Sequence, residues 1–154
     1  MDIPVELIIE EVTPAEVFPH LATLDRYPSW MRLVHRVDPV EPDENRPAWW
    51  VELRARVGLF TRSKQLRMVR TIYEPDERVR FERVQPDERD HATWVMTATT
   101  EPVGDDTHVL VHLQYGGSLW TGGLLERVLE EEVRSGREAL RRLVTGEGPA
   151  PPRR

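Results

Sequence analysis

The chain has 154 residues, which fits one domain with a sizeable core, because a chain of this length buries roughly 70% of the surface that its unfolded form exposes. Hydrophobic residues make up 39% and charged residues 31%, the balance of an ordinary globular protein. A formal net charge of −6 argues against a protein that binds nucleic acid by neutralising phosphates, and the lack of cysteine excludes disulfides, thiol nucleophiles and cysteine-ligated zinc.

The N-terminal residues predict a half-buried strand followed by a helix. Apolar and polar side chains alternate over residues 2–9, as they do in a strand with one buried face. Thr13, Pro14 and Glu16 then occupy the positions of a capping box with proline in the first turn, which predicts a helix that begins at residue 14.

Residues 14–34 predict two short helical pieces separated by proline. Pro19 breaks the first piece, and Pro28 is tolerated only near the start of the second, which reads YPSWMRLV. The stretch LDRYPSWM also gathers Tyr27, Trp30 and Met31 around a proline turn, an unusual amount of apolar surface for a connecting segment.

The middle of the chain predicts about six antiparallel strands. A proline-punctuated strand at 35–42 suits a sheet edge, and alternating strands follow at 48–57, 64–75, 79–84, 91–102 and 107–115. Turn sequences such as GLFTR and VGDD separate these strands.

The period of the pattern changes to that of a long helix over residues 119–144. We therefore expect one domain over residues 1–145 and a disordered proline- and glycine-rich tail over residues 146–154. One amphipathic helix cannot fill the whole concave face of a curved sheet, so this element order predicts a cavity between them.

Three segments carry a resemblance to a known family: TPAEVFPHLATLDRYPSWM, IYEPDERVRFE and LLERVLEEEVRSGREALRRL. They resemble the START-related superfamily, which includes birch-pollen-allergen-like proteins, lipid-transfer domains and bacterial polyketide cyclase/dehydrase-like proteins. The resemblance covers residues 2 to about 144. It implies an α+β helix-grip fold, in which a seven-stranded curved antiparallel sheet wraps around a long C-terminal helix and two short helices follow the first strand.

On this fold, the short helices would roof one end of the cavity, with Tyr27, Trp30 and Met31 at its opening. Packing of Trp30 into the core is an equal alternative. Ten residues are candidates for ligand contact, since they share an inward phase on the expected strands and helices: Trp30, Trp49, Met68, Arg70, Arg83, Trp94, Met96, Tyr115, Glu132 and Gly136.

Tryptophan, tyrosine and methionine offer broad or adaptable apolar contacts, whereas an inward charge such as Glu132 needs a partner, a ligand or water. Ordinary core packing remains the alternative for the apolar residues, and a strand bulge or a side chain that reaches solvent remains the alternative for Arg70 and Arg83. Gly136 either leaves room for a ligand or allows close packing of the helix.

The chemistry of these residues leaves three functions open. The first is a carrier that binds a lipid, polyketide or isoprenoid, and the second is a polyketide cyclase or dehydratase. The third is a protein-interaction module, for which a basic face along Arg54, Arg56, Arg62 and Lys64 is the relevant feature.

The resemblance also suggests candidates for catalysis. Aromatase/cyclases of the superfamily use pocket arginine, tyrosine and tryptophan, so the resemblance makes Arg70 and Tyr115 candidates. Glu132 is a further candidate, because a carboxylate can move protons.

The sequence predicts neither a cofactor nor a metal site. His108 and His112 lie about 13 Å apart on an extended strand and could not share a metal ion. No phosphate-binding or dinucleotide motif is present in the sequence. We expect a hydrophobic small molecule as the partner and no nucleic acid, and we leave a homodimer open. No secretory signal or membrane-spanning apolar run is evident, so we expect a cytoplasmic protein.

Overall fold

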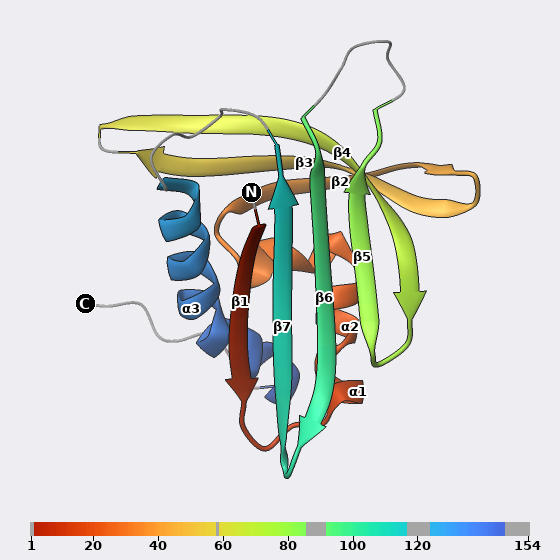
Figure 1. Ribbon diagram of the computed structural model, residues 1–154, viewed down its shortest axis with the longest axis vertical. Coiled ribbons are helices and arrows are strands. Elements are labelled where there is room, and N and C mark those ends of the chain that lie inside the picture. The colour runs from red at the N-terminus through yellow and green to blue at the C-terminus, as the bar shows by residue number, and fades with distance from the viewer. Residues whose placement is uncertain (1, 58, 86–91, 117–123, 147–154) are drawn as a thin grey trace.

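The structure is a computed structural model that describes residues 2–57, 59–85, 92–116 and 124–146 (Figure 1). Seven antiparallel strands form one sheet in the order β1-β7-β6-β5-β4-β3-β2. The strands are β1 (Asp2–Ile9), β2 (Val34–Asp43), β3 (Arg46–Val57), β4 (Phe60–Glu74), β5 (Arg78–Arg83), β6 (Trp94–Val103) and β7 (Asp106–Tyr115). The helices are α1 (Pro14–Val17), α2 (Pro19–Ala22), the 3₁₀ helix η1 (Leu24–Ser29) and α3 (Leu124–Thr145).

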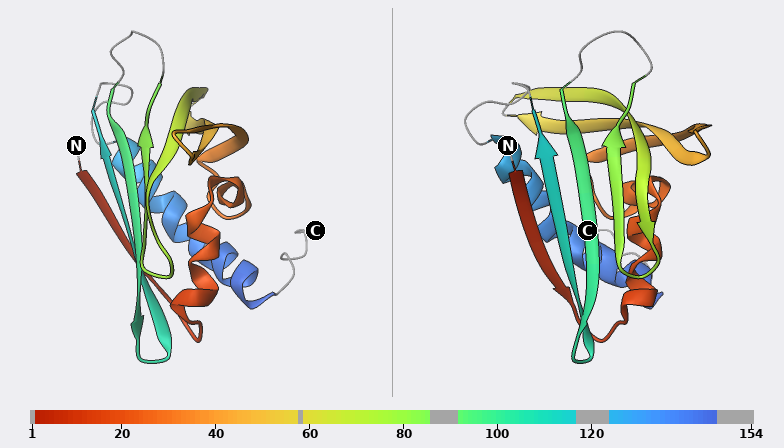
Figure 2. Two further views of the ribbon diagram at one scale, coloured as in Figure 1. Left: turned by 90° about the vertical axis from the view of Figure 1, so that its right-hand side faces the viewer. Right: turned by 45° about the vertical axis from the view of Figure 1, so that its right-hand side comes forward.

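This arrangement confirms the α+β helix-grip fold. All the helices lie on one side of the sheet, and α3 crosses that side diagonally (Figure 2). The predicted first turn of the long helix, residues 119–123, and the predicted tail after residue 146 lie outside the described residues. No helix in the described part of the chain has the length and apolar character needed to cross a membrane.

The sheet bends along β4. Strands β1, β7, β6 and β5 run along the long axis of the molecule, whereas β2, β3 and the first part of β4 cross its end (Figure 1). The pairing of β4 with β5 has a register shift between Arg70 and Ile72. A bulge of this kind bends a strand, and it allows β4 to take part in both portions of the sheet.

The predicted capping box begins α1. The hydroxyl of Thr13 accepts a hydrogen bond from the Glu16 backbone N–H, and the Glu16 carboxylate accepts one from the Thr13 backbone N–H. Pro19 separates α1 from α2, as predicted, because it has no N–H to continue the first helix.

The second helical piece differs from the prediction. It starts at Leu24 rather than Tyr27, it is a 3₁₀ helix, and it ends at Ser29. The N–H of Trp30 donates to the carbonyl of Tyr27 at 3.0 Å, which closes the last tight turn. Trp30 itself has φ −135°, so the chain leaves the helical conformation there and continues into β2.

The core fills the space between the concave face of the sheet and the helices. Ile3, Leu7 and Ile9 of β1 are buried, as the alternation predicts. Around Phe81, aromatic rings meet edge to face: the centroid of Trp49 is 5.7 Å away and that of Tyr27 is 6.1 Å away. Such contacts favour a fixed arrangement of the η1 roof over the sheet.

Candidate ligand-binding cavity

An apolar cavity of about 60 Å³ lies between η1 and the sheet. Among the described residues, only apolar atoms face it. Its described lining comes from η1 and the segment after it, from β2, β3 and β4, and from β6 and β7: Leu24, Tyr27, Met31, Leu33, Val34, Val51, Leu53, Leu66, Met68, Trp94, Met96, Val111 and Leu113.

The walls follow from the strand registers. Val51 of β3 lies opposite Leu66 of β4, and Met96 of β6 lies opposite Leu113 of β7. Directly opposed residues of antiparallel strands point to the same face, so each pair presents two apolar side chains to the same space. The alternation seen in the sequence therefore creates a continuous apolar wall.

Tyr27 closes the roof. Its hydroxyl donates a hydrogen bond of 2.8 Å to the carbonyl of Leu21, and its side chain is fully buried. Burial raises the pKa of the Tyr27 phenol far above its usual value, since the charged form would lose its hydration. Because its hydroxyl is committed to Leu21, Tyr27 offers the cavity an aromatic surface and no polar group.

Three of the ten candidate residues line the cavity: Met68, Trp94 and Met96. Trp94 is 4% exposed and its ring packs on that of Tyr115, with centroids 5.5 Å apart. No described residue accepts a hydrogen bond from the buried Nε1 of Trp94. A buried donor of this kind costs stability unless something satisfies it. Only apolar atoms of the described residues face the cavity, so Trp94 lines it with ring carbons and not with Nε1.

Four other candidates are buried outside the described lining: Trp30, Trp49, Tyr115 and Gly136. Trp30 donates from Nε1 to the carbonyl of His20 at 3.3 Å and stacks on Tyr27, with ring centroids 5.0 Å apart. The position of Trp30 corresponds to the core-packing alternative.

The two arginines bind backbone carbonyls. Arg70 donates from Nη1 to Ala22 O at 2.9 Å, at the end of α2, and its guanidinium lies 4.2 Å from the centroid of the Tyr73 ring. Partial burial lowers the pKa of Arg70. Arg83 donates from Nη1 to Ala92 O at 3.2 Å and from Nε to the side chain of Gln85. Neither arginine is part of the described lining.

Glu132 is half-buried on α3, one turn before Gly136. Its Oε2 is buried and has no hydrogen-bond partner among the described residues. It does not belong to the described lining of the cavity. Of the three candidates for catalysis, Glu132 is the one with a buried polar atom that no described partner satisfies.

Most of the lining was not among the candidates, although Tyr27 and Met31 were expected at the opening. The missed side chains are Leu24, Leu33, Val34, Val51, Leu53, Leu66, Val111 and Leu113. Most of them share the inward phase that the sequence pattern shows, so the pattern could have identified them. Leu33 and Val34 are exceptions, because they are neighbours at the start of β2 in a segment that was predicted as helical. The pattern could not show which inward residues the helices leave uncovered, because that depends on how η1 and α3 sit on the sheet.

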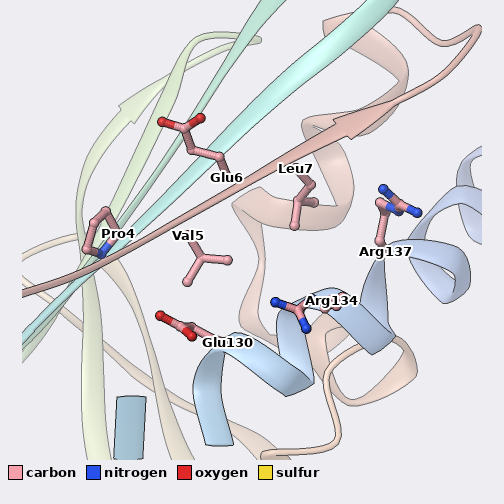
Figure 3. Close-up of a pocket in the computed structure, with 7 residues that line it drawn as sticks. All are labelled: Pro4, Val5, Glu6, Leu7, Glu130, Arg134 and Arg137. Carbon is pink, nitrogen blue, oxygen red and sulfur yellow. The ribbon is translucent and has the colours of Figure 1, made fainter. Parts of the chain in front are cut away.

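A wider groove of about 450 Å³ runs between β1 and α3. Figure 3 shows Val5 and Leu7 of β1 on the side that faces Glu130 and Arg134 of α3, while Glu6 points to the other side of the strand. The groove is lined largely by charged side chains, so it lacks the apolar lining of a site for an apolar ligand. Within the described ranges, no group of three histidine or acidic side chains could hold a metal ion.

The chain resembles known proteins in sequence and in fold. The family model for polyketide cyclase/dehydrase and lipid transport proteins matches residues 11–141. The protein TTHA0849 from Thermus thermophilus is similar in structure, with a TM-score of 0.71 and 18% identity over 95% of this chain and 98% of that chain. A START superfamily protein from Mycobacterium smegmatis has a TM-score of 0.65 and 13% identity over 94% of this chain and 97% of that chain.

A third similar structure is the di-domain ARO/CYC StfQ from the steffimycin biosynthetic pathway. It has a TM-score of 0.67 and 12% identity over 95% of this chain and 51% of that chain. No curated protein sequence matches this chain. The similar structures share the helix-grip fold of this chain. The family model covers most of the chain, and its match shows that the protein belongs to the polyketide cyclase/dehydrase and lipid transport family.

Proposed function

We propose that the protein binds an apolar small molecule, such as a lipid, polyketide or isoprenoid, in the cavity beneath η1. The observation that carries the proposal is a cavity in the core of a domain of this family, to which the described residues present only apolar atoms. Small-molecule sites are mostly apolar and usually carry a few placed polar groups. We further propose that widening of the cavity exposes the buried, unpartnered Nε1 of the lining residue Trp94, so the preferred ligand has a hydrogen-bond acceptor on an apolar body.

The cavity must widen to admit such a ligand. Sites for drug-sized molecules usually span roughly 300–1,000 Å³. The cavity of about 60 Å³ is therefore a starting volume and not a finished site. The cavity can widen by movement of Met31, Met68 and Met96, because methionine has three rotatable bonds and repacks with little strain.

Ligand binding can be tested by native mass spectrometry followed by thermal unfolding with apolar compounds of increasing size. A ligand that binds only the folded protein at 100 times its Kd should stabilise it by about 2.7 kcal/mol. Val111→Leu places an extra methylene in the cavity and should weaken this stabilisation. Val109→Leu is the matched control, since Val109 lies on the same face of β7, is buried, and does not line the cavity.

Equal ligand stabilisation in the Val111→Leu and Val109→Leu variants would contradict the proposed site. A second comparison tests the role of Trp94, using paired ligands that differ only in a carbonyl group. The wild-type protein should prefer the carbonyl compound by about tenfold, and Trp94→Phe should reduce that preference to near unity. No preference in the wild-type protein would remove Trp94 Nε1 from the scheme.

Polyketide cyclase activity is the second candidate function. The fold shared with StfQ and the unpartnered buried Oε2 of Glu132 favour it. The engagement of Arg70 with Ala22 O and its absence from the cavity lining weigh against it. Cyclase activity would be supported if the protein converts a polyketide substrate, if Glu132→Gln abolishes this turnover and if Arg70→Lys retains it. Unchanged turnover in Glu132→Gln would exclude Glu132 as the acid or base of the reaction.

A further inference from the structure

The most exposed large apolar side chains of the described residues lie side by side at the tip of the β3–β4 hairpin. Leu59 is 91% exposed and Phe60 is 73% exposed. The β3–β4 hairpin projects beyond β1 and α3, at the end of the molecule that β2 and β3 cross (Figure 1). Leaving two such residues in water is unfavourable, so their exposure calls for a partner.

Cations surround this tip. The segment from Arg54 to Lys64 contains four of them and no acidic residue, although the whole chain has a formal charge of −6. Arg56 and Arg62 are exposed and make no ion pair within the described part of the chain. Arg54 is also exposed, and its Nη2 lies 3.4 Å from the Glu52 carboxylate.

The strand register places these cations on both faces of the hairpin. Arg62 lies opposite Ala55, a buried residue of the concave face, whereas Arg56 occupies the neighbouring position of β3 and points to the other face. Arg62 is two residues from Phe60, a distance of about 7 Å along a strand. Apolar groups that insert at a membrane interface reach roughly 5–10 Å into the headgroup region, so the arginines would lie at the level of the phosphates.

We propose that the β3–β4 hairpin docks the protein on an anionic lipid bilayer, with Leu59 and Phe60 inserted and Arg56 and Arg62 at the headgroups. A bilayer fits this surface better than a polyanion, which has no use for two exposed apolar side chains. It also fits better than a protein partner, because a stable interface needs roughly 800 Å² on each side and two residues at a tip supply far less. This inference goes beyond the proposed function and does not depend on it.

The hairpin also connects the bilayer to the cavity. Leu53 of β3 and Leu66 of β4 line the cavity, and Leu59 at the tip is six positions further along the chain than Leu53. At the usual rise of a strand, the cavity wall lies roughly 20 Å from the inserted tip. Docking by this hairpin would therefore hold the cavity close to the membrane surface.

Co-sedimentation of the full chain with vesicles tests the proposal. The wild-type protein should bind phosphatidylcholine vesicles that contain phosphatidylserine and should not bind pure phosphatidylcholine vesicles. Binding should weaken between about 0.1 M and about 0.5 M NaCl, because salt screens the attraction. The double variant Leu59→Ser/Phe60→Ser should lose at least about tenfold in partition coefficient.

Two matched controls separate this tip from general surface effects. Val103→Ser removes an exposed apolar residue, 48% exposed, from the β6–β7 hairpin, where Glu101, Asp105 and Asp106 make the surroundings acidic. It should leave binding unchanged. Arg56→Gln/Arg62→Gln should weaken binding by about tenfold or more, whereas Arg36→Gln/Arg78→Gln removes two cations that already contact acids and should have little effect.

All of these substitutions lie on the surface, so circular dichroism and thermal unfolding should match the wild type. The proposal is overturned if the wild-type protein does not bind the anionic vesicles, or if the Leu59→Ser/Phe60→Ser variant binds them as well as the wild type. Binding to heparin or RNA that needs the arginines and not the apolar tip, without vesicle binding, would instead identify a polyanion site and would equally overturn it.

Discussion

Gly136 of α3 lies directly against the backbone of Trp30. A Cβ atom added to Gly136 would come within 2.4 Å of the Trp30 carbonyl oxygen and 3.1 Å of its Cε3 atom. The missing side chain is therefore what allows α3 to approach the segment that follows η1. Of the two roles open from the sequence, the structure places Gly136 in close packing, and whether it also contacts a ligand stays a prediction.

Gly136→Ala should destabilise the protein. Alanine favours a helix over glycine by about 1 kcal/mol, but overpacking a tight contact costs about 1–3 kcal/mol, and here the obstacle is backbone that cannot rotate away. Urea unfolding should show a net loss of up to about 2 kcal/mol. Ser135→Ala, an exposed change on the same helix, should be neutral or slightly stabilising; a gain in stability for Gly136→Ala would contradict the packing described.

Filling the cavity should stabilise the protein without ligand. An enclosed apolar void costs roughly 24 cal/mol per Å³, so about 60 Å³ corresponds to at most about 1.4 kcal/mol. Val111→Leu should recover part of this and raise the melting temperature, whereas Val109→Leu adds the same methylene where no void exists and should lower it. If both variants lower the melting temperature by the same amount, Val111 has no space to fill.

Arg70 should stabilise the junction between α2 and the sheet. Its hydrogen bond to Ala22 O joins β4 to the end of α2, and a hydrogen bond from a charged group contributes about 1–2 kcal/mol at a partly exposed site. Arg70→Leu should lower the free energy of unfolding by that amount, and Arg70→Lys should restore part of it. Unchanged urea midpoints in both variants would show that the contact contributes no stability.

Acid should destabilise the protein partly through His20. Burial in α2, and then the charge of Arg26, lower the pKa of His20 below its usual 6.5. Between the lowered pKa of His20 in the folded protein and its pKa of 6.5 in the unfolded chain, the unfolded chain binds more protons. The contribution of His20 to the free energy of unfolding is therefore complete above pH 6.5 and is lost as the pH falls from 6.5 towards the pKa of the folded state. His20→Gln should reduce the drop in melting temperature between about pH 7 and about pH 5.

Arg26→Gln provides a control for the cause of the His20 shift. Removing the nearby cation should raise the His20 pKa and shrink the same pH dependence, without removing the histidine. A pH dependence that stays as steep in both variants as in the wild-type protein would assign the acid sensitivity to other groups.

The sequence predicted the fold closely because its signals are local. The Thr13 capping box, the break at Pro19 and the alternation of β1 each depend on residues a few positions apart, and each is confirmed. The start of η1 was misplaced because a tight 3₁₀ turn tolerates Pro28 inside it, whereas the pattern was interpreted as an α-helix that needed proline near its start.

The candidate site was harder to predict because it depends on contacts between distant segments. Periodicity placed Met68, Trp94 and Met96 on inward faces, and all three line the cavity. It could not show that Arg70 would reach the end of α2, 48 residues away in sequence, or that Trp30 would be covered by α3. Only the packing of the helices on the sheet decides which inward residues face empty space.

The register shift between Arg70 and Ile72 divides β4 into two stretches, and the alternation of inward and outward side chains starts anew in the second one. With the hairpin tip held in register with β3, a one-residue insertion or deletion between Phe60 and Leu66 would turn Leu66 and Met68 outward and bring their polar neighbours Gln65 and Arg67 into the core. Homologous chains should therefore vary in length at the hairpin turns and keep the number of residues in this first stretch of β4 constant.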